Sequence, residues 1–203
     1  MLPNPIKKFV DIFSQLPSIG PRQATRLAFY LFNLGPSEVG ELAQSIADLQ
    51  NLRRCPSCFF IHGGGGGLCH ICGDERRRKD IVMVVEKETD LISLEKAGGF
   101  QGRYFVTGDL KKRGILESEQ KMKLNSLKSS IKKEFGAPPE GGAEEIILAF
   151  NPTTYGDYNA SLLSQELKDC AKKITRLGRG IPTGGEIEFA DEETLGGALQ
   201  NRR

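Results

Sequence analysis

The chain has 203 residues, of which 28 are Lys or Arg and 26 are Asp or Glu, so its formal net charge is only +2. This length supports one medium-sized domain or two small ones with a hydrophobic core. The balanced charge excludes a globally basic surface, so any contact with nucleic acid must depend on local clusters. We see no apolar stretch long enough to cross a bilayer and no secretion signal, and we therefore expect a cytoplasmic protein.

The first fifty residues are predicted to form helices. Apolar residues recur at helical spacing from Ile6 to Phe13. A second helix is expected to begin at Pro21 and a third to have Ser37 as its N-cap, because proline suits the first helical position and serine suits the cap. A tight apolar connection around Ile19-Gly20 joins the first two helices. Together they predict a helix-hairpin-helix unit.

Arg22 and Arg26 lie one turn apart on the predicted second helix. Free amides at the start of a helix, beside a loop of small residues, can approach a phosphate closely, and the two arginines could reach phosphates on either side. Two arginines on a helix are also a common solvated face, and a purely structural helical pair is the alternative. Because the hairpin lies beside them, we favour contact with DNA.

Two Cys-x-x-Cys pairs, separated by ten residues, form the most specific motif of the chain. Each pair is expected to form a tight turn, and four thiolates complete the tetrahedral coordination of a zinc ion. We predict one structural zinc ion per chain, bound by Cys55, Cys58, Cys69 and Cys72. Disulfides or a redox dithiol are the alternatives, against which the even spacing and the missing secretion signal argue. His62 or His70 could in principle replace one cysteine.

A compact basic run, Arg76-Arg77-Arg78-Lys79, follows the cysteines. It could contact phosphate, or it could be neutralised locally by Asp74, Glu75 and Asp80. The sequence leaves both possibilities open.

From Asp80 onward, short apolar runs alternate with helical patterns. The runs predict strands at Ile81–Val85, Tyr104–Val106, Ile146–Phe150 and Ile174–Leu177. Strands that alternate with helices predict an α/β fold with a doubly wound parallel sheet. Cys170 is expected on the helix before the fourth strand, where it serves core packing.

Few acidic residues follow the strands at which such sheets bind their ligands. Glu86 follows the first strand, and the third strand leads into the segment from Asn151 to Asp157, in which Asp157 is the only acid. Two-metal phosphoryl transfer needs several carboxylates, because amides and hydroxyls do not offset the charge of the ions. The chain also lacks a Gly-x-x-x-x-Gly-Lys-Ser/Thr phosphate loop. We therefore expect no catalysis.

The order of these parts closely resembles the RecR family of bacterial recombination mediators. A helix-hairpin-helix and a four-cysteine site are followed by a strand ending Val84-Val85-Glu86 and a strand leading into Asn151-Pro152-Thr153. The closing segment Gly180–Glu186 fits the same family. The resemblance covers nearly the whole chain, and the combination is far more specific than any single motif.

The resemblance implies a non-catalytic Toprim domain in a protein that forms dimers or ring-like tetramers and binds single- and double-stranded DNA without regard to sequence. It implies action with RecO and RecF to load RecA onto single-stranded DNA. The four cysteines match the zinc ligands, Arg22 and Arg26 match basic positions of the hairpin unit, and Glu86 matches the Toprim glutamate. Asn151 to Asp157 match the second Toprim motif in degenerate form. The alternative function is a Toprim-type metal-dependent nuclease or primase.

Three departures from the family pattern identify a divergent member. Ser18 replaces a hairpin glycine, so a positive φ there would strain the backbone. Tyr155-Gly156-Asp157 replaces Glu-Gly-Glu. Lys111, Lys112 and Arg113 replace a Ser-Pro turn, and we expect these three residues to contact DNA.

Four parts are expected along the chain. Residues 1–54 form the helix-hairpin-helix domain and residues 55–79 the zinc finger. Residues 80–174 form the Toprim domain, and residues 175–203 a C-terminal arm and helix.

Overall fold

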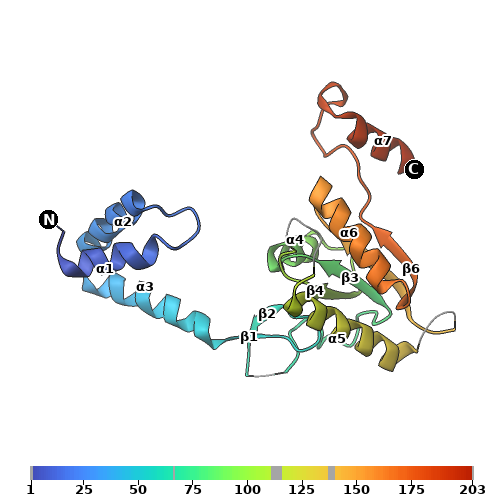
Figure 1. Cartoon of the computed structure of the whole chain (residues 1–203), viewed down its shortest axis with the longest axis horizontal. Helices are drawn as coiled ribbons and strands as arrows, with labels where there is room; N and C mark the ends of the chain where they lie inside the picture. Colours follow the sequence, from blue (N-terminus) through green and yellow to red (C-terminus); the bar gives the residue numbers. More distant parts are fainter. Residues whose placement is uncertain (1, 66, 111–115, 137–139, 203) are drawn as a thin grey trace. The chain divides into compact units, whose positions relative to one another are not determined.

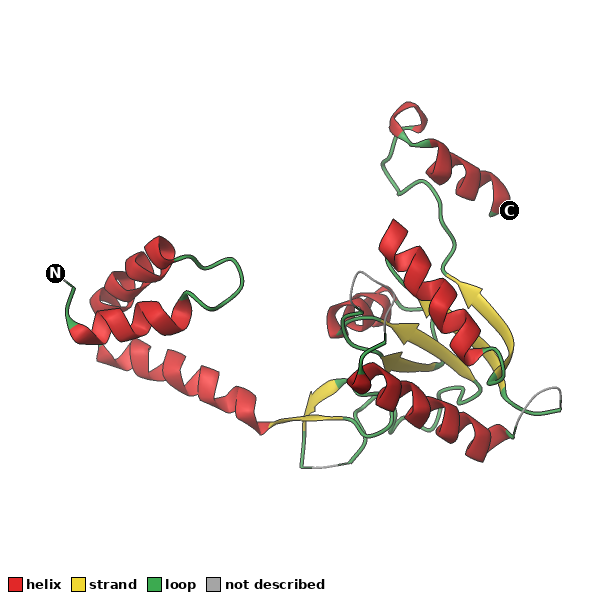
Figure 2. Cartoon of the chain, viewed as in Figure 1, coloured by secondary structure: helices red, strands yellow, loops and turns green. Residues whose placement is uncertain are grey.

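The computed structural model describes residues 2–65, 67–110, 116–136 and 140–202. The chain divides into two compact units, Met1–Leu52 and Arg53–Arg203. The first unit is helical and the second contains strands and helices (Figures 1 and 2). Among the described residues, no helix is both long enough and apolar enough to span a membrane.

The first unit consists of three helices and a final turn. They are α1 (Asn4–Phe13), α2 (Pro21–Leu34), α3 (Pro36–Asp48) and the 3-10 turn η1 (Leu49–Asn51). Pro21 is the first residue of α2, as predicted. The prediction of Ser37 as the third N-cap is wrong, because Pro36 takes the first helical position and Gly35 precedes it at φ +107°.

The connection between α1 and α2 contains a serine in a left-handed conformation. Ser18 has φ +64°, and the next residue, Ile19, donates its amide to the carbonyl of Leu16 at 3.2 Å. A side chain at such a φ is unfavourable because its Cβ approaches the backbone. The hairpin therefore holds the strain that the sequence predicted for a positive φ at this position.

A four-stranded parallel sheet forms the centre of the second unit. Its strands are β3 (Ile81–Val85), β4 (Arg103–Val106), β5 (Ala143–Ala149) and β6 (Ala171–Arg176), in the order β4-β3-β5-β6. The connecting helices are α4 (Glu88–Ala97), α5 (Ser118–Phe135) and α6 (Thr154–Leu167). Val84 on β3 pairs with Phe105 on β4 and with Leu148 on β5, all in parallel register. The predicted α/β fold with a doubly wound parallel sheet is confirmed.

Side chains that alternate along β3 pack into two separate cores. Val82 and Val84 contribute to a core with buried residues of α5 and α6. Met83 and Val85 contribute to a second core with Leu91 of α4 and three buried cysteines. Figure 1 shows α5 and α6 on the opposite side of the sheet from α4. The cysteine segment therefore completes the α4 side of the sheet.

Cys170 is buried but does not lie on a helix. The last residue of α6 is Leu167, whose carbonyl accepts the Cys170 amide at 2.9 Å in the turn before β6. The side chain is only 8% exposed and belongs to the core on the α5 and α6 side. The predicted core packing is correct, and the predicted helical position is wrong.

Short elements complete the chain. They are β1 (Leu52–Arg54), which pairs with β2 (Ile61–Gly63), the 3-10 turn η2 (Ile187–Phe189) and the terminal helix α7 (Glu192–Gln200). Asp191 caps α7 by accepting the Thr194 amide at 2.8 Å. Such a side-chain acceptor satisfies an amide that has no partner within the helix.

Candidate functional site

The four paired cysteines converge on one point. Their Sγ atoms all lie within 4.8 Å of one another, and those of Cys58 and Cys69 are 3.5 Å apart. Four sulfurs at about 2.3 Å from one zinc ion would be about 3.8 Å apart, so the arrangement fits tetrahedral coordination. The separation is much longer than the roughly 2 Å of a disulfide bond, and the thiols are free. The cluster consists of cysteines without either histidine.

Two backbone amides donate hydrogen bonds to sulfur atoms of this cluster. The amides of Cys69 and Cys72 donate to Cys55 Sγ and Cys69 Sγ at 3.4 and 3.5 Å. The contact between Cys58 and Cys69 lowers the pKa of Cys69 and raises the pKa of Cys58. A bound metal ion would hold thiolates and release these protons. The donor set therefore fits a structural zinc ion.

The cysteine segment is fixed to the edge strand of the sheet. The Val106 amide, at the end of β4, donates to the carbonyl of Cys58 at 2.8 Å. The adjacent Phe59 has φ +63° and places its ring edge-to-face against Phe105, with the centroids 5.5 Å apart. The cysteine cluster is thereby attached to the sheet through β4.

Glu86, which follows β3, binds a backbone amide. Its side chain is 9% exposed, and its Oε1 accepts the Leu110 amide at 3.0 Å. Burial raises the pKa of Glu86, and the hydrogen bond from Leu110 offsets part of that shift. The Glu86 carboxylate therefore binds the backbone of its own chain.

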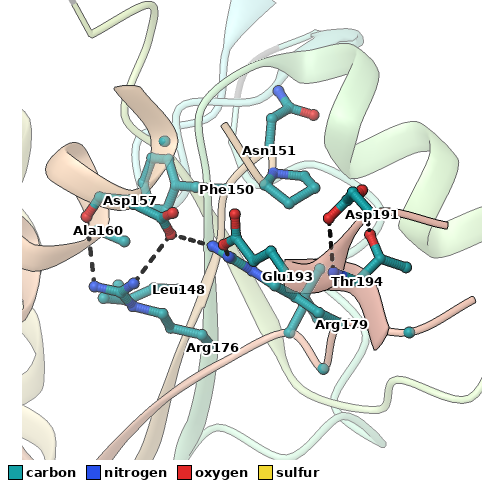
Figure 3. Close-up of a pocket in the computed structure, with 15 residues that line it drawn as sticks. Leu148, Phe150, Asn151, Asp157, Ala160, Arg176, Arg179, Asp191, Glu193 and Thr194 are labelled. Carbon is teal, nitrogen blue, oxygen red and sulfur yellow. Dashed lines mark hydrogen bonds and ion pairs between the residues drawn. The ribbon is translucent and has the colours of Figure 1, made fainter. Parts of the chain in front are cut away.

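Asp157, in the first turn of α6, lies between two arginines (Figure 3). Arg176 Nη1 approaches its Oδ1 at 3.2 Å, and Arg179 Nη2 binds the same oxygen. Arg176 also donates to the Ser161 hydroxyl at 2.9 Å. Two guanidinium groups thus neutralise the single carboxylate of the second predicted motif.

The C-terminal segment closes a pocket of about 320 Å³ around this pair of arginines. Arg179 binds Glu193 of α7 as well as Asp157, and its carbonyl accepts the Asn201 amide group at 2.9 Å. Asn151 and Asp157 both line the pocket, whereas Glu86 does not. The structure therefore places Glu86 and Asp157 in different surroundings.

Gly156 permits the close approach of α6 to the preceding loop. A Cβ at this position would collide with the carbonyl of Asn151. Thr153 caps α6 by accepting the Gly156 amide at 3.1 Å. Position 156 of the degenerate motif thus requires glycine, because any side chain there would collide with the backbone.

Arg22 and Arg26 are exposed at the beginning of α2. With Gly20, Pro21 and Gln23 they line a hollow of about 450 Å³. Neither guanidinium forms an ion pair with another described residue. Both side chains are therefore available to an anion beside the helix start.

The three arginines of the basic run after the cysteines form ion pairs within the protein. Arg76 binds Asp74 at 2.9 Å and Arg78 binds Asp80 at 2.7 Å. Arg77 pairs with Glu95 of α4. Local neutralisation, one of the two possibilities that the sequence left open, is observed for these three arginines, and contact of the run with phosphate stays untested. The other predicted basic residues, Lys111, Lys112 and Arg113, lie outside the described residues.

Sequence reasoning missed the two arginines that bind Asp157 and a buried lysine whose ammonium group lies over the Phe59 ring, next to Cys58. Arg176 and Arg179 could have been noticed, because Arg176 ends β6 and Arg179 follows three residues later, at the carboxyl end of a parallel strand. Lys123 on α5 is only 2% exposed and gave no signal, because it lies among many lysines of a polar helix.

Comparison with known families agrees with this arrangement. The family model "RecR, helix-hairpin-helix" matches residues 6–49, the Toprim domain model matches residues 80–178, and "RecR, C-terminal" matches residues 180–203. The helix-hairpin-helix and Toprim parts of the predicted fold are thereby confirmed.

Curated relatives match over the whole chain. Recombination protein RecR of Chloroflexus aurantiacus is 36% identical over 206 aligned positions, covering 100% of this chain and 96% of the relative. The Frankia alni protein of that name is 35% identical, covering 98% and 96%. The Bifidobacterium adolescentis protein is 36% identical, covering 98% and 95%. Because these relatives match over the full length and the RecR family models match both ends of the chain, the chain belongs to the RecR family of recombination proteins.

Proposed function

We propose that this protein is a non-catalytic DNA-binding mediator of recombinational repair in the cytoplasm. It binds single- and double-stranded DNA without regard to sequence and assembles into a dimer or ring-like tetramer. Together with RecO and RecF it loads RecA onto single-stranded DNA. Membership of the RecR family and the hairpin unit support DNA binding.

The proposal that the protein is not a catalyst rests on one observation: both carboxylates, Glu86 and Asp157, already bind groups of the same chain. Asp157 is neutralised by Arg176 and Arg179, and Glu86 accepts the Leu110 amide. Phosphoryl transfer by two metal ions needs free carboxylates around those ions. A magnesium ion at Asp157 would have to displace two guanidinium groups. We therefore propose that Glu86, Asn151 and Asp157 serve folding or partner contact.

The proposed cofactor is one structural zinc ion per chain. It would be held by Cys55, Cys58, Cys69 and Cys72. The ion would cross-link the cysteine segment, and four protein ligands would leave it no open coordination position for catalysis. The chain itself contributes amide donors to the sulfurs and a rigid link from Cys58 to β4.

DNA contact is proposed at the beginning of α2 and at the segment Lys111–Arg113. Arg22 and Arg26 are exposed cations beside a helix terminus that carries partial positive charge. Contacts of this kind neutralise phosphates and release counterions, and they carry no base information.

The DNA-binding claim is tested by replacing both helix arginines. We expect Arg22→Ala with Arg26→Ala to weaken binding on every DNA sequence, measured by fluorescence anisotropy between about 50 and 200 mM salt. The slope of log K against log salt should fall by about one to two, since each lost phosphate contact removes about 0.7–0.9. Lys7→Ala with Lys8→Ala is the matched control, because it removes two exposed charges from α1 of the same unit.

The control double variant should lose less affinity than the arginine variant. Equal affinity and equal salt slope in the arginine variant and the wild type would contradict the proposed contact.

A further inference from the structure

Phe59, the residue after Cys58, has a backbone conformation that glycine adopts freely and phenylalanine does not. Its φ is +63°, in the left-handed region, where the Cβ of a bulky residue crowds the backbone. Such a conformation persists only where the surrounding structure holds it. The Phe59 amide donates to the Cys55 carbonyl at 2.9 Å, and the Cys55 amide donates to the Phe60 carbonyl at 2.8 Å. The turn that brings Cys55 and Cys58 together therefore also fixes Phe59.

The Phe59 ring packs on the opposite side of the sheet from the cysteines. Cys58 belongs to the core beside α4, whereas Phe59 packs against the core beside α5 and α6. Its ring meets Phe105 edge-to-face, with the centroids 5.5 Å apart. Because the Cys58 carbonyl accepts the Val106 amide, the chain passes around the edge strand β4 at this point. Phe59 thus connects the cysteine cluster to the α5 side of the sheet.

The Phe59 ring also lies beside a buried ammonium group. Lys123 on α5 is 2% exposed, and its Nζ lies 5.5 Å from the centroid of the ring. An aromatic face attracts a cation, most strongly where water is excluded. The same Nζ donates to the Thr107 carbonyl at 3.3 Å and pairs with Glu119 at 3.0 Å. Since a buried ammonium group is unfavourable without such partners, the ring helps to keep this donor on Thr107.

Thr107 begins a segment, Thr107–Leu110, at the carboxyl end of the sheet. Its amide donates to the Val85 carbonyl at 3.0 Å, and the Leu110 amide donates to Glu86 at 3.0 Å. β3 and β4 end directly before Glu86 and Thr107. Ligands of parallel sheets bind at the carboxyl ends of the strands. The contacts of Phe59 therefore extend from the cysteine cluster to the edge of the sheet at which such ligands bind.

We propose that Phe59 is a positioning residue that couples metal binding by the cysteine cluster to the conformation of Thr107–Leu110. This inference rests on the proposed zinc ion and adds a regulatory role to it. While the cysteines hold the ion, their turn keeps Phe59 left-handed and its ring beside Lys123. Without the ion, Phe59 relaxes to a negative φ, the ring leaves Lys123, and Thr107–Leu110 loosens. The carboxyl end of the sheet thereby becomes sensitive to the availability of metal.

Two substitutions break this coupling and leave the cysteines in place. Phe59→Gly removes the ring and suits a φ of +63°, so the zinc ion should stay bound. Its matched control is Phe60→Ala, which removes the neighbouring ring, one that lies against His70 with the centroids 6.3 Å apart. Lys123→Met keeps the apolar stem and removes the ammonium group. Lys128→Met is its control, because Lys128 lies on the same helix and forms its ion pair with α6.

The experiment measures zinc content and residue-resolved hydrogen exchange on the full chain, with and without a chelator. In the zinc-loaded proteins, we expect Phe59→Gly and Lys123→Met to exchange the amides of Thr107 and Leu110 about tenfold faster than the wild type. The two control variants should match the wild type at both amides. Chelation should accelerate both amides in the wild type, and it should add little in Phe59→Gly, where the coupling is already lost.

Unchanged exchange at Thr107 and Leu110 in zinc-loaded Phe59→Gly would overturn the coupling. Acceleration by the chelator to the same extent in Phe59→Gly and in the wild type would also overturn it, because the metal would then act by another route. Protection of the β5 amides reports whether each protein is folded.

Lys123→Met keeps the question decidable should chelation unfold the wild type or Phe59→Gly lose its zinc ion. Unchanged exchange at Thr107 and Leu110 in zinc-loaded Lys123→Met would then overturn the proposal. A wild-type protein without zinc would overturn the proposed cofactor instead, and the comparison of Phe59→Gly with Phe60→Ala would still decide whether the ring holds the segment.

Discussion

At the scale of single residues, the backbone conformation of Ser18 is unfavourable for the stability of the hairpin. Its φ of +64° is one that glycine adopts freely and serine does not. We expect Ser18→Gly to stabilise the first unit by about 1 kcal/mol, because it removes the unfavourable Cβ contact. Amide exchange across α1 and α2 in increasing urea measures the change.

The comparison at this position is Ser18→Ala. Alanine retains the Cβ, so it should give no such gain in stability. A Ser18→Gly protein no more stable than the alanine variant would show that the hairpin stores no strain at this residue.

Glu86 predicts a dependence of stability on pH. Burial raises its pKa most. Asp109 and Asp90 raise the pKa slightly further, and Lys87 lowers it. The folded protein therefore binds this proton more tightly than the unfolded chain, and wild-type stability falls as the pH rises between the unfolded and folded pKa values. Glu86→Gln does not titrate.

The stability of Glu86→Gln relative to the wild type should increase as the pH is raised through this window, which begins at about 4.3, and then stay level. Urea denaturation of both proteins over about pH 4 to 7 measures it. A relative stability that does not change with pH would mean that Glu86 is not desolvated in the folded state.

At the scale of elements, the cysteine segment acts as part of the core beside α4. Cys55 and Cys58 are buried with Met83 and Val85, and Val106 is hydrogen-bonded to Cys58. We expect purified protein to contain about one zinc ion per chain, measured by atomic emission. Cys55→Ser should lose the ion and destabilise the second unit by at least about 2 kcal/mol, with faster exchange at the end of β4.

Cys170→Ala is the control for this substitution, because Cys170 lies in the core on the other side of the sheet. It should retain the zinc ion. A zinc content near zero in wild-type protein that is kept reduced and away from chelators would contradict the assignment of the metal site.

Elements set by local patterns were predictable, and contacts between distant residues were not. The doubled Cys-x-x-Cys spacing and the apolar run Ile81–Val85 act over a few residues, so the cysteine cluster and β3 followed from the sequence. Ser37 was misjudged because proline and glycine before it outweighed a good cap. The helix that was expected to carry Cys170 ends at Leu167, and Cys170 lies in the turn into β6.

The partners of the site residues depended on the sheet order. Asp157 meets Arg176 because β6 lies beside β5, and Lys123 reaches Thr107 because α5 packs against the sheet. No pattern within α5 distinguishes Lys123 from its exposed neighbours. The four-part division of the chain at residues 54, 79 and 174 stays a prediction.

At the scale of the whole molecule, a net charge of +2 hides an uneven distribution of available cations. Arg76, Arg77 and Arg78 are paired with acidic residues of the second unit. Arg22 and Arg26 have no such partner among the described residues. These two unpaired cations lie close together on α2, which agrees with the proposed salt-sensitive contact with phosphates.

The central claim is that this RecR-family protein binds DNA without changing it. The most direct test incubates the pure protein with labelled single- and double-stranded DNA, nucleotides, and magnesium or manganese, and follows both binding and product. We predict bound DNA of unchanged length and sequence, because the Asp157 carboxylate is neutralised and Glu86 is engaged with Leu110. Metal-dependent cleavage or synthesis that disappears in Glu86→Gln would contradict the account and identify an enzyme.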